Sequence, residues 1–240
     1  VYATNLTDAA RAAVRLSGAQ PAPQAEEPLP AESFGEETKI LGLYSGGTLA
    51  SEAALLIRRA FGMQDAAEKT GYLLASPSCD VLDLGDDLYT KGKPHPMMDA
   101  EARKEKMEEL AEETSRPVVV LFDVELGYGS QADPATALAE GVRKLRAQKE
   151  QAGQQVAFVV NLLGTARDPQ DIGRQAQILR DAGCYVYEGN VRAIEAALKI
   201  AGRTLPEVQH VEAQPPQPIQ LPAPSAQQMA LLQKAPGGVN

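Results

Sequence analysis

The chain has 240 residues, of which 44% are hydrophobic and 23% charged, a composition typical of a globular protein with one good core. Its formal net charge of −9 at pH 7, with no run of Lys and Arg, argues against nucleic acid or an anionic membrane as the partner. The two cysteines, Cys79 and Cys184, are too few for a disulfide framework and lack metal-ligand spacing, which favours a reducing, cytoplasmic setting. The longest apolar runs, 118–122 and 156–163, are too short to span a membrane.

The two ends of the chain differ in composition from its middle. The first residue is Val1 rather than Met, which indicates a cut or processed end, and residues 1–17 hold a short predicted helix that we interpret as the tail of a preceding domain. Residues 18–37 are rich in Pro, Ala, Gln and Glu and predict an extended, solvated linker. Residues 204–240, rich in Pro and Gln, predict a second linker and the start of a C-terminal segment.

Residues 39–61 predict a buried strand, a glycine turn and an amphipathic helix. The glycines of the turn Ser45-Gly46-Gly47-Thr48 let the backbone bend sharply and approach a ligand, and the hydroxyls lie where the first helical N–H groups lack partners. The turn fits two interpretations equally well, an anion site at a helix N-terminus and a tight turn with Thr48 as the N-cap. It matches neither a Walker motif nor GxGxxG, which disfavours a P-loop or dinucleotide site.

The remainder of residues 38–203 alternates strands with helices. Strands are predicted at 81–84, 118–123, 155–163 and 185–187, with a weaker short strand within 71–75, and helices at 97–113, 133–151, 170–182 and 190–201. Asp99, Asp133 and Asn190 are expected to cap three of these helices, and Pro134 strengthens the second start. This alternation predicts an α/β fold, a doubly wound parallel sheet of the flavodoxin type flanked by linkers.

Such sheets bind ligands outside the carboxyl ends of their strands, where four polar, glycine-bearing loops are expected at 45–48, 85–96, 123–130 and 164–168. His95, between two prolines, is a candidate for catalysis or substrate contact, although an inert loop histidine is the commoner case; His210, in the Pro-rich tail, is expected to be inert. No Ser or Cys lies in a nucleophile elbow, which disfavours acyl-enzyme hydrolysis.

Charged side chains in these loops have two interpretations each. Solvated loop acids, or a Mg²⁺ site that accompanies a phosphate, both explain the carboxylates at the ends of two strands, Asp83, Asp86, Asp87 and Asp123. Lys91, Lys93 and Arg167 are candidates to bind a phosphate or carboxylate, with a solvated surface as the default.

Four segments, in this order and at these spacings, resemble the FdrA family: GLYSGGTLASEAALL, LDLGDDLYTKGKPHPMMD, LFDVELGYGSQADPA and GTARDPQ. That family is related to the α-subunit of succinyl-CoA synthetase, and the likeness covers about residues 41–201. The resemblance implies a flavodoxin-like CoA-ligase domain, which a CoA-binding Rossmann domain precedes in the synthetases. The chain would then be a fragment of a longer protein.

The resemblance also implies a site. Ser45, Gly46, Gly47 and Thr48 match the turn whose helix N-terminus holds a phosphohistidine or phosphate in the synthetases. Where those enzymes carry the phosphohistidine loop, residues 163–170 contain no histidine, which disfavours a phosphohistidine relay. FdrA-like proteins are linked instead to purine and allantoin breakdown, as components of an oxamate carbamoyltransferase that interconverts oxalurate and phosphate with oxamate and carbamoyl phosphate. Such a transfer needs a phosphate site and no covalent histidine.

The leading hypothesis is therefore carbamoyl transfer at the strand ends. The residues expected to act are Ser45, Gly46, Gly47 and Thr48 for phosphate, His95, Asp123 and Lys93 for catalysis, and Gly164, Thr165 and Arg167 for the second substrate. The expected ligand is phosphate or carbamoyl phosphate, no metal ligand is assigned although Mg²⁺ is an option, and the expected partners are a small anionic substrate and other subunits of a homo- or hetero-oligomer. The alternatives are an NDP-forming acyl-CoA synthetase with an unusual phosphate carrier and a non-catalytic subunit-binding domain.

Overall fold

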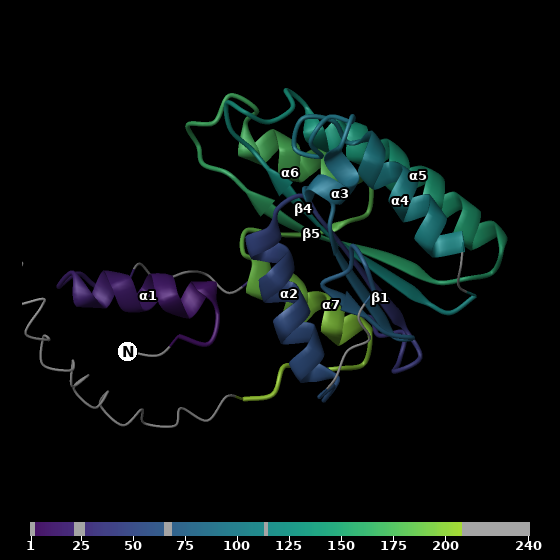
Figure 1. Ribbon diagram of the computed structural model, residues 1–240, viewed down its shortest axis with the longest axis horizontal. Coiled ribbons are helices and arrows are strands. Elements are labelled where there is room, and N and C mark those ends of the chain that lie inside the picture. Colours follow the sequence, from purple (N-terminus) through teal and green to yellow (C-terminus); the bar gives the residue numbers. More distant parts are fainter. Residues whose placement is uncertain (1–2, 22–26, 65–68, 113–114, 208–240) are drawn as a thin grey trace, which may run out of the picture. The chain divides into compact units, whose positions relative to one another are not determined.

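The computed structural model describes residues 3–21, 27–64, 69–112 and 115–207, all within one compact unit. Its elements, in chain order, are α1 (Leu6–Leu16), β1 (Lys39–Tyr44), α2 (Gly47–Ala60), β2 (Leu74–Ala75), β3 (Cys79–Asp83), α3 (Asp87–Thr90), α4 (Glu101–Glu112), β4 (Val118–Glu125), α5 (Pro134–Gln151), β5 (Val156–Leu163), α6 (Ile172–Asp181), β6 (Tyr185–Tyr187) and α7 (Asn190–Ile200) (Figure 1). The second predicted linker lies outside the described residues from 208 onward.

The strands form a six-stranded sheet in the order β2-β3-β1-β4-β5-β6. Four of the neighbouring pairs are parallel, and β2 pairs with β3 in the antiparallel sense. The connection between β2 and β3 is too short for a parallel crossover, so this edge strand turns back as a hairpin. Without β2, the order is 2-1-3-4-5, the flavodoxin order, which confirms the predicted fold.

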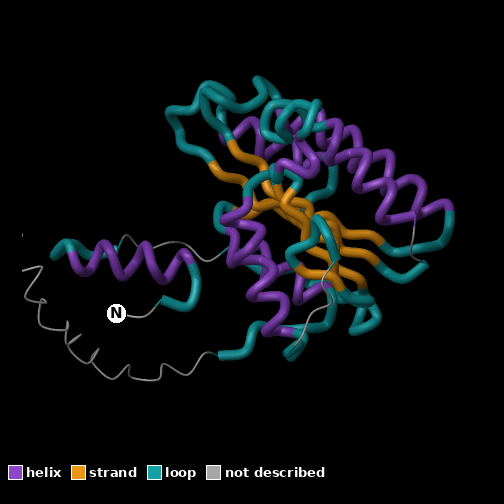
Figure 2. The backbone as a smooth tube through the Cα atoms, viewed as in Figure 1, coloured by secondary structure: helices purple, strands orange, loops and turns teal. Residues whose placement is uncertain are grey.

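Helices cover both faces of the sheet, which lies between them in Figure 2. In one core, strand residues such as Phe122 pack with Met107 of α4, Leu138 of α5 and Leu179 of α6. The other packs the opposite face against α2 and α7. Strands covered on both faces need nearly continuous apolar runs, as β4 has.

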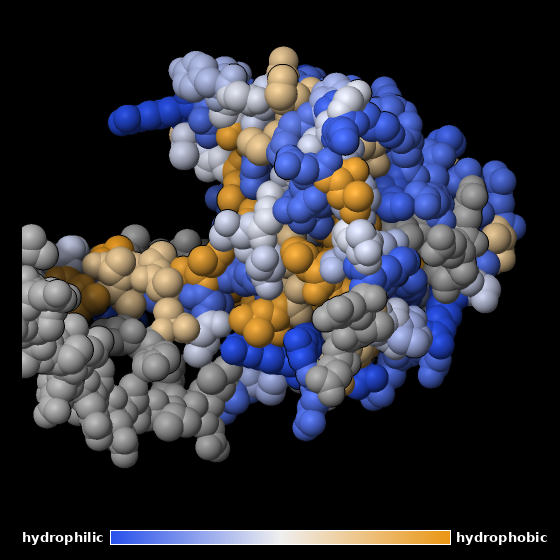
Figure 3. Space-filling view, viewed as in Figure 1, coloured by the Kyte–Doolittle hydropathy of each residue, from blue (hydrophilic) through white to orange (hydrophobic). Residues whose placement is uncertain are grey.

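On the face in Figure 3, hydrophobic side chains are scattered among hydrophilic ones. No helix in the described ranges is both long and apolar enough to cross a bilayer.

Helix starts agree with the sequence at some positions and differ at others. Asp133 caps α5 by accepting from the N–H of Thr136, and Pro134 is the first helical residue, as predicted. Asp99 accepts from the N–H of Glu101 at 2.9 Å, but α4 begins at Glu101 and not at the predicted residue 97, so Asp99 lies two residues before the helix. The capping role predicted for Asn190 is wrong, because Gly189 is the N-cap of α7 and Asn190 is its first residue.

Residues 27–37, which we call the strap, differ from the solvated linker predicted there. Leu29 and Phe34 pack against the core on the α2 and α7 side. The Phe34 N–H donates to the carbonyl of Ile200 at 2.7 Å, and the Tyr187 hydroxyl donates to the carbonyl of Pro28 at 3.0 Å. The packing of these two apolar side chains and the two hydrogen bonds hold the strap against α7 and β6. Residues 22–26 of the predicted linker lie outside the described residues.

Candidate functional site

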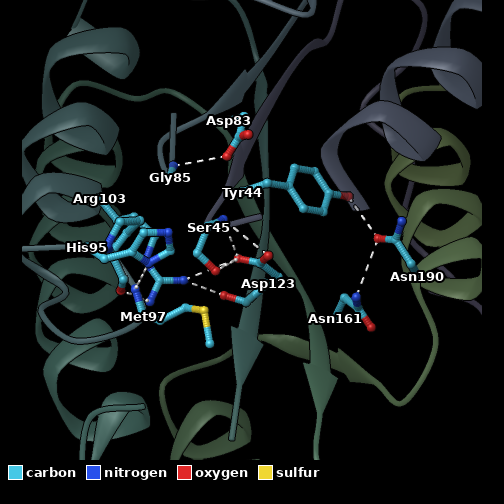
Figure 4. A network of polar contacts seen from close by, with 11 residues as sticks. Tyr44, Ser45, Asp83, Gly85, His95, Met97, Arg103, Asp123, Asn161 and Asn190 are labelled. Atoms are coloured by element: carbon cyan, nitrogen blue, oxygen red, sulfur yellow. Dashed lines mark hydrogen bonds and ion pairs between the residues drawn. The ribbon is translucent and has the colours of Figure 1, made fainter. Parts of the chain in front are cut away.

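The strand order reverses at β1, which has β3 on one side and β4 on the other. In doubly wound sheets the crevice at such a switch point, at the carboxyl ends of the strands, is where ligands bind. The chain places Ser45 directly after β1, and Asp123 near the end of β4. Figure 4 shows these two side chains converging with that of Arg103.

Asp123 is a fully buried carboxylate at this edge of the sheet. The Ser45 N–H donates to its Oδ1 and Oδ2 at 2.9 and 3.1 Å, and the Ser45 hydroxyl donates to Oδ1 at 2.8 Å. Burial raises the pKa of the Asp123 carboxyl, and this is opposed by Arg103 and by the two Ser45 donors. A charge without partners is costly at this depth, so these donors compensate the burial of Asp123.

The guanidinium of Arg103, on α4, is the cationic partner of Asp123 and is only 1% exposed. Its Nη1 lies 3.3 Å from Asp123 Oδ1 and donates to the main-chain carbonyl of Asp123 at 2.5 Å. Nη2 donates to the carbonyl of Pro96 at 2.9 Å. Burial lowers the pKa of Arg103, which Asp123 and Glu125 oppose.

The sequence analysis missed Arg103, which lies in a strongly charged helix. The sequence feature that could have revealed its burial is helical spacing. Ala100, Arg103 and Met107 follow one another at intervals of three and four residues and therefore share one face, and all three are buried.

The N–H and the hydroxyl of Ser45 both donate to Asp123, so Ser45 has no donor left for an anion in this arrangement. Helix α2 begins at Gly47, and its N-cap is Gly46, which carries no side chain to cap the first turn. Thr48 is therefore in the first turn and is not the predicted N-cap. Gly47 and Thr48 are exposed, and the first N–H groups of a helix have no partner within it.

Two carboxylates lie beside this helix start. A Cβ on Gly47 would be 2.8 Å from Asp83 Oδ2, so only glycine fits there without displacing the carboxylate. A Cβ on Gly46 would lie 3.4 Å from Glu125 Oε1. The sequence analysis missed Glu125, because β4 continues two residues beyond its predicted end at Asp123.

His95 approaches the same place from the loop after β3. A Cβ on Gly85 would lie 2.7 Å from His95 Nε2 and 2.5 Å from the carbonyl oxygen of Ser45, so Gly85 permits the close approach of the imidazole. The N–H of Met97 donates to His95 Nδ1 at 3.3 Å, which assigns the proton of the neutral ring to Nε2. The structure thus brings His95 to the turn between β1 and α2.

No hydrogen bond or ion pair within the described residues joins the other predicted site residues to this turn. The Lys93 ammonium lies 3.5 Å from the carboxylate of Glu105, and both side chains are 60% exposed. The Thr165 N–H donates to Asp168 Oδ2 at 2.5 Å, and the Arg167 N–H donates to Thr165 Oγ1 at 3.2 Å. These bonds close the turn after β5, which Gly164 begins, one strand away from β4 along the same edge.

A second polar network fixes the first turn of α2 from the opposite face (Figure 4). Asn190 accepts from the Tyr44 hydroxyl at 3.0 Å and donates to the carbonyl of Leu49 at 3.1 Å and to Glu52 Oε2 at 2.8 Å. Asn190 therefore joins the start of α7 to the start of α2, a tertiary role that its sequence context as a cap does not reveal.

The carboxylates for which a Mg²⁺ site was one of two interpretations do not form one group. Asp86 accepts from the N–H of Leu88 as the cap of α3, and Asp87 lies within that helix. Among the residues that the structure describes, no group of three His, Cys, Asp or Glu side chains is arranged to hold a metal ion. A Mg²⁺ ion that accompanies a phosphate stays an untested option.

Comparison with known proteins gives two findings. Residues 43–200 match the family model of the CoA-ligases. The chain is also 32% identical over 154 residues to the uncharacterized protein YahF of Escherichia coli (strain K12), a match that covers 62% of the chain and 30% of YahF. The chain thus spans less than a third of this relative. Because the family model covers well over half of its residues, the chain belongs to the CoA-ligase family.

Proposed function

We propose that the start of α2 binds the phosphate of a small substrate whose transferred group carries N–H donors, as carbamoyl phosphate does. The observation that carries this proposal is the combination of two exposed residues in the first turn, Gly47 and Thr48, with two adjacent carboxylates, Asp83 and Glu125. Helix N–H groups and the helix dipole favour phosphate. The carboxylates accept hydrogen bonds from the carbamoyl –NH₂ group, which bare phosphate lacks.

The reaction that fits is phosphorolysis of oxalurate. An oxygen of hydrogen phosphate attacks the carbamoyl carbon, the bond from that carbon to the oxamate nitrogen breaks, and the proton of hydrogen phosphate ends on that nitrogen. The Nε2–H of His95 donates a hydrogen bond to the leaving nitrogen and stabilises the charge that develops there, while the proton passes to that nitrogen from the hydrogen phosphate. Asp123 does not contact the substrate in this scheme, since it is fully buried, and it holds Ser45 in place.

The loop after β5 supports a transfer without a covalent histidine. Residues 163–170 contain no histidine, and Thr165 and Asp168 close this loop on itself. The FdrA-like motifs of the sequence support the same choice. Lys93 and the Gly164, Thr165 and Arg167 turn are proposed to approach the second anion at the same edge.

The alternative function is an acyl-CoA synthetase, which membership of the CoA-ligase family favours. A phosphate carrier would then be needed, and the candidate is His95, whose imidazole lies near the turn between β1 and α2. Radiolabelled phosphate that becomes covalently attached to His95 would support this alternative and exclude the transferase scheme.

The assay that tests the proposal is phosphorolysis of oxalurate by the full-length protein, alone and with co-encoded subunits, with carbamoyl phosphate as the measured product. We expect product that is lost in the His95→Ala variant. A lack of product, together with phosphate binding, would favour the synthetase. A lack of phosphate binding, together with a stable complex with partner chains, would favour a non-catalytic subunit-binding domain.

Thr48→Asp isolates the phosphate site. An acidic residue in the first turn stabilises a helix by roughly 0.3–1 kcal/mol, yet it places negative charge beside the bound anion. We expect a melting temperature at least equal to that of the parent and loss of phosphate binding in calorimetry. Thr48→Asn is the matched neutral control and should bind. Gly47→Asp is the poorer test, because a Cβ there would meet Asp83 at 2.8 Å.

Phosphate binding to Thr48→Asp with the affinity of the parent would refute the proposed site.

A further inference from the structure

One buried guanidinium contacts two segments that border the candidate site. Through Nη1, Arg103 contacts the carbonyl and the carboxylate of Asp123, and the same carboxylate holds the N–H and hydroxyl of Ser45. Through Nη2, Arg103 holds the carbonyl of Pro96, the residue after His95. The start of α2 and the His95 loop are thus both attached to a single side chain of α4.

The contacts of Arg103 are more than those of an ion pair. Two of its acceptors are main-chain carbonyls, which a charge partner alone does not require. Buried ion pairs are weak evidence for stability, since apolar replacements of such pairs are often neutral or stabilising. A guanidinium at this depth with carbonyl acceptors in two segments is better explained by the geometry that it imposes.

We propose that Arg103 is a positioning residue that fixes the separation between the His95 loop and the first turn of α2. In the transferase scheme this separation sets the distance from His95 Nε2 to the phosphate, so that part of the inference rests on the proposed function. The attachment of the two segments to one side chain does not depend on the reaction.

The shape of the side chain is specific to this role. The planar fork of arginine presents Nη1 and Nη2 to different acceptors at once, here the carbonyls of Asp123 and Pro96. A lysine retains the charge but offers one nitrogen, which cannot hold both segments in the same geometry. Arg103→Lys therefore separates the effect of charge from that of positioning.

The test compares three variants of the complete chain. Arg103→Met with Asp123→Asn removes the buried pair without leaving an unpaired charge, Arg103→Lys keeps the charge, and Arg174→Met is the matched control. Arg174 pairs with Asp133 at 2.7 Å and is 54% exposed, away from α2. The readouts are the phosphate dissociation constant, the ¹⁵N and ¹H resonances of the His95 imidazole, and the amide resonances of Gly47 and Thr48. With two histidines in the sequence, the imidazole spectrum is simple to assign.

We expect the double variant and Arg103→Lys to remain folded, to bind phosphate about tenfold more weakly, and to show shifted resonances of His95 and of the α2 amides. Arg174→Met should leave all three readouts unchanged. Folded Arg103 variants with His95 resonances and phosphate affinity as in the parent would overturn the inference. If the double variant does not fold, Arg103→Lys decides.

The inference and the proposed function fail in different ways. If the parent binds no phosphate, the proposed function fails, while coupled shifts of His95 and Gly47 in ligand-free Arg103→Lys would still support the positioning role. If the parent binds phosphate and neither set of resonances moves, the positioning role fails alone.

Discussion

At the scale of single residues, glycine at positions 47 and 85 determines which side chains can approach the start of α2. A Cβ at Gly47 would displace the carboxylate of Asp83, and a Cβ at Gly85 would displace the imidazole of His95. Both positions follow strands at the carboxyl edge, where the backbone must leave the sheet. The chemistry proposed for this edge therefore depends on positions that carry no functional group.

Glu125 places a carboxylate beside the start of α2, and its negative charge opposes the binding of bare phosphate there. Burial raises the pKa of its carboxyl, and Asp123 and Asp83 add to the effect while Arg103 opposes it. A folded-state pKa above the unfolded value of about 4.3 means that the stabilising contribution is complete below that pH and is lost as the pH rises through the folded pKa.

Glu125→Gln should therefore raise the urea midpoint at pH 7, have little effect near pH 4, and tighten phosphate binding at neutral pH. Chemical denaturation across this pH range, with Glu109→Gln at a 57% exposed position as control, measures the effect. An equal change in midpoint at both pH values would contradict this account.

Sequence reasoning identified some of these residues because their loops follow predicted strands. His95 and the glycine turn were found in this way. Arg103 and Glu125 were missed, since sequence does not show which cation of a charged helix is buried or how far a strand continues.

At the scale of elements, α2 and α5 begin in opposite ways. Asp133 caps α5 by accepting from Thr136 and also holds Arg174 and Gln175, whereas α2 begins after a glycine. The well-capped start of α5 suits a structural helix, and the uncapped start of α2 leaves donors for a ligand.

Asp133 carries a pH dependence of stability. Burial acts to raise its pKa, but hydrogen bonds from Arg174, Gln175 and Thr136 outweigh it and lower the pKa. The stabilisation is then complete above the unfolded pKa of about 3.9 and is lost as the pH falls through the lower folded pKa. Asp133→Ala should cost about 1 kcal/mol at pH 7, as loss of a cap does, and less below pH 3.

Acid titrations of the parent and of Asp133→Ala at fixed urea check this prediction, with Asp133→Asn as the variant that keeps a capping oxygen without the charge. A stability difference that grows as the pH falls would contradict it.

Caps were predictable where local sequence decides them, as at Asp133. The cap predicted at Asn190 was wrong, and Thr48, the cap in one of two interpretations of its turn, lies in the first turn of α2 instead. Asn190 is the first residue of α7, and its side chain bonds to Tyr44, Leu49 and Glu52, residues far away in the sequence. The two residues of β2 were likewise too few to predict from the sequence that it pairs with β3 in the antiparallel direction.

At the scale of the whole molecule, the strap makes residues 27–37 part of the folded unit. Leu29 and Phe34 pack on the same core as α7, and the Arg192 guanidinium binds the carbonyl of Glu27. A chain that begins at Thr38 should therefore be less stable than one that begins at Glu27, by roughly 2 kcal/mol for two half-buried apolar side chains.

Urea denaturation of the two truncated chains measures the difference. Phe34→Ala in the complete chain should reproduce part of the loss, and Leu16→Ala, at a 74% exposed position, should reproduce none. Equal midpoints for the two truncated chains would show that the strap adds no stability.

The bonds between Ser45 and Asp123 join residues 78 positions apart, across the central pair of strands. Closing a chain segment of this length is a slow, non-local step compared with the formation of a helix. During synthesis, the turn after β1 leaves the ribosome long before its carboxylate partner, so a chain arrested before β4 lacks the bonds between Ser45 and Asp123. The arrangement of this edge is consequently acquired late, and its formation reports that the central strands have joined.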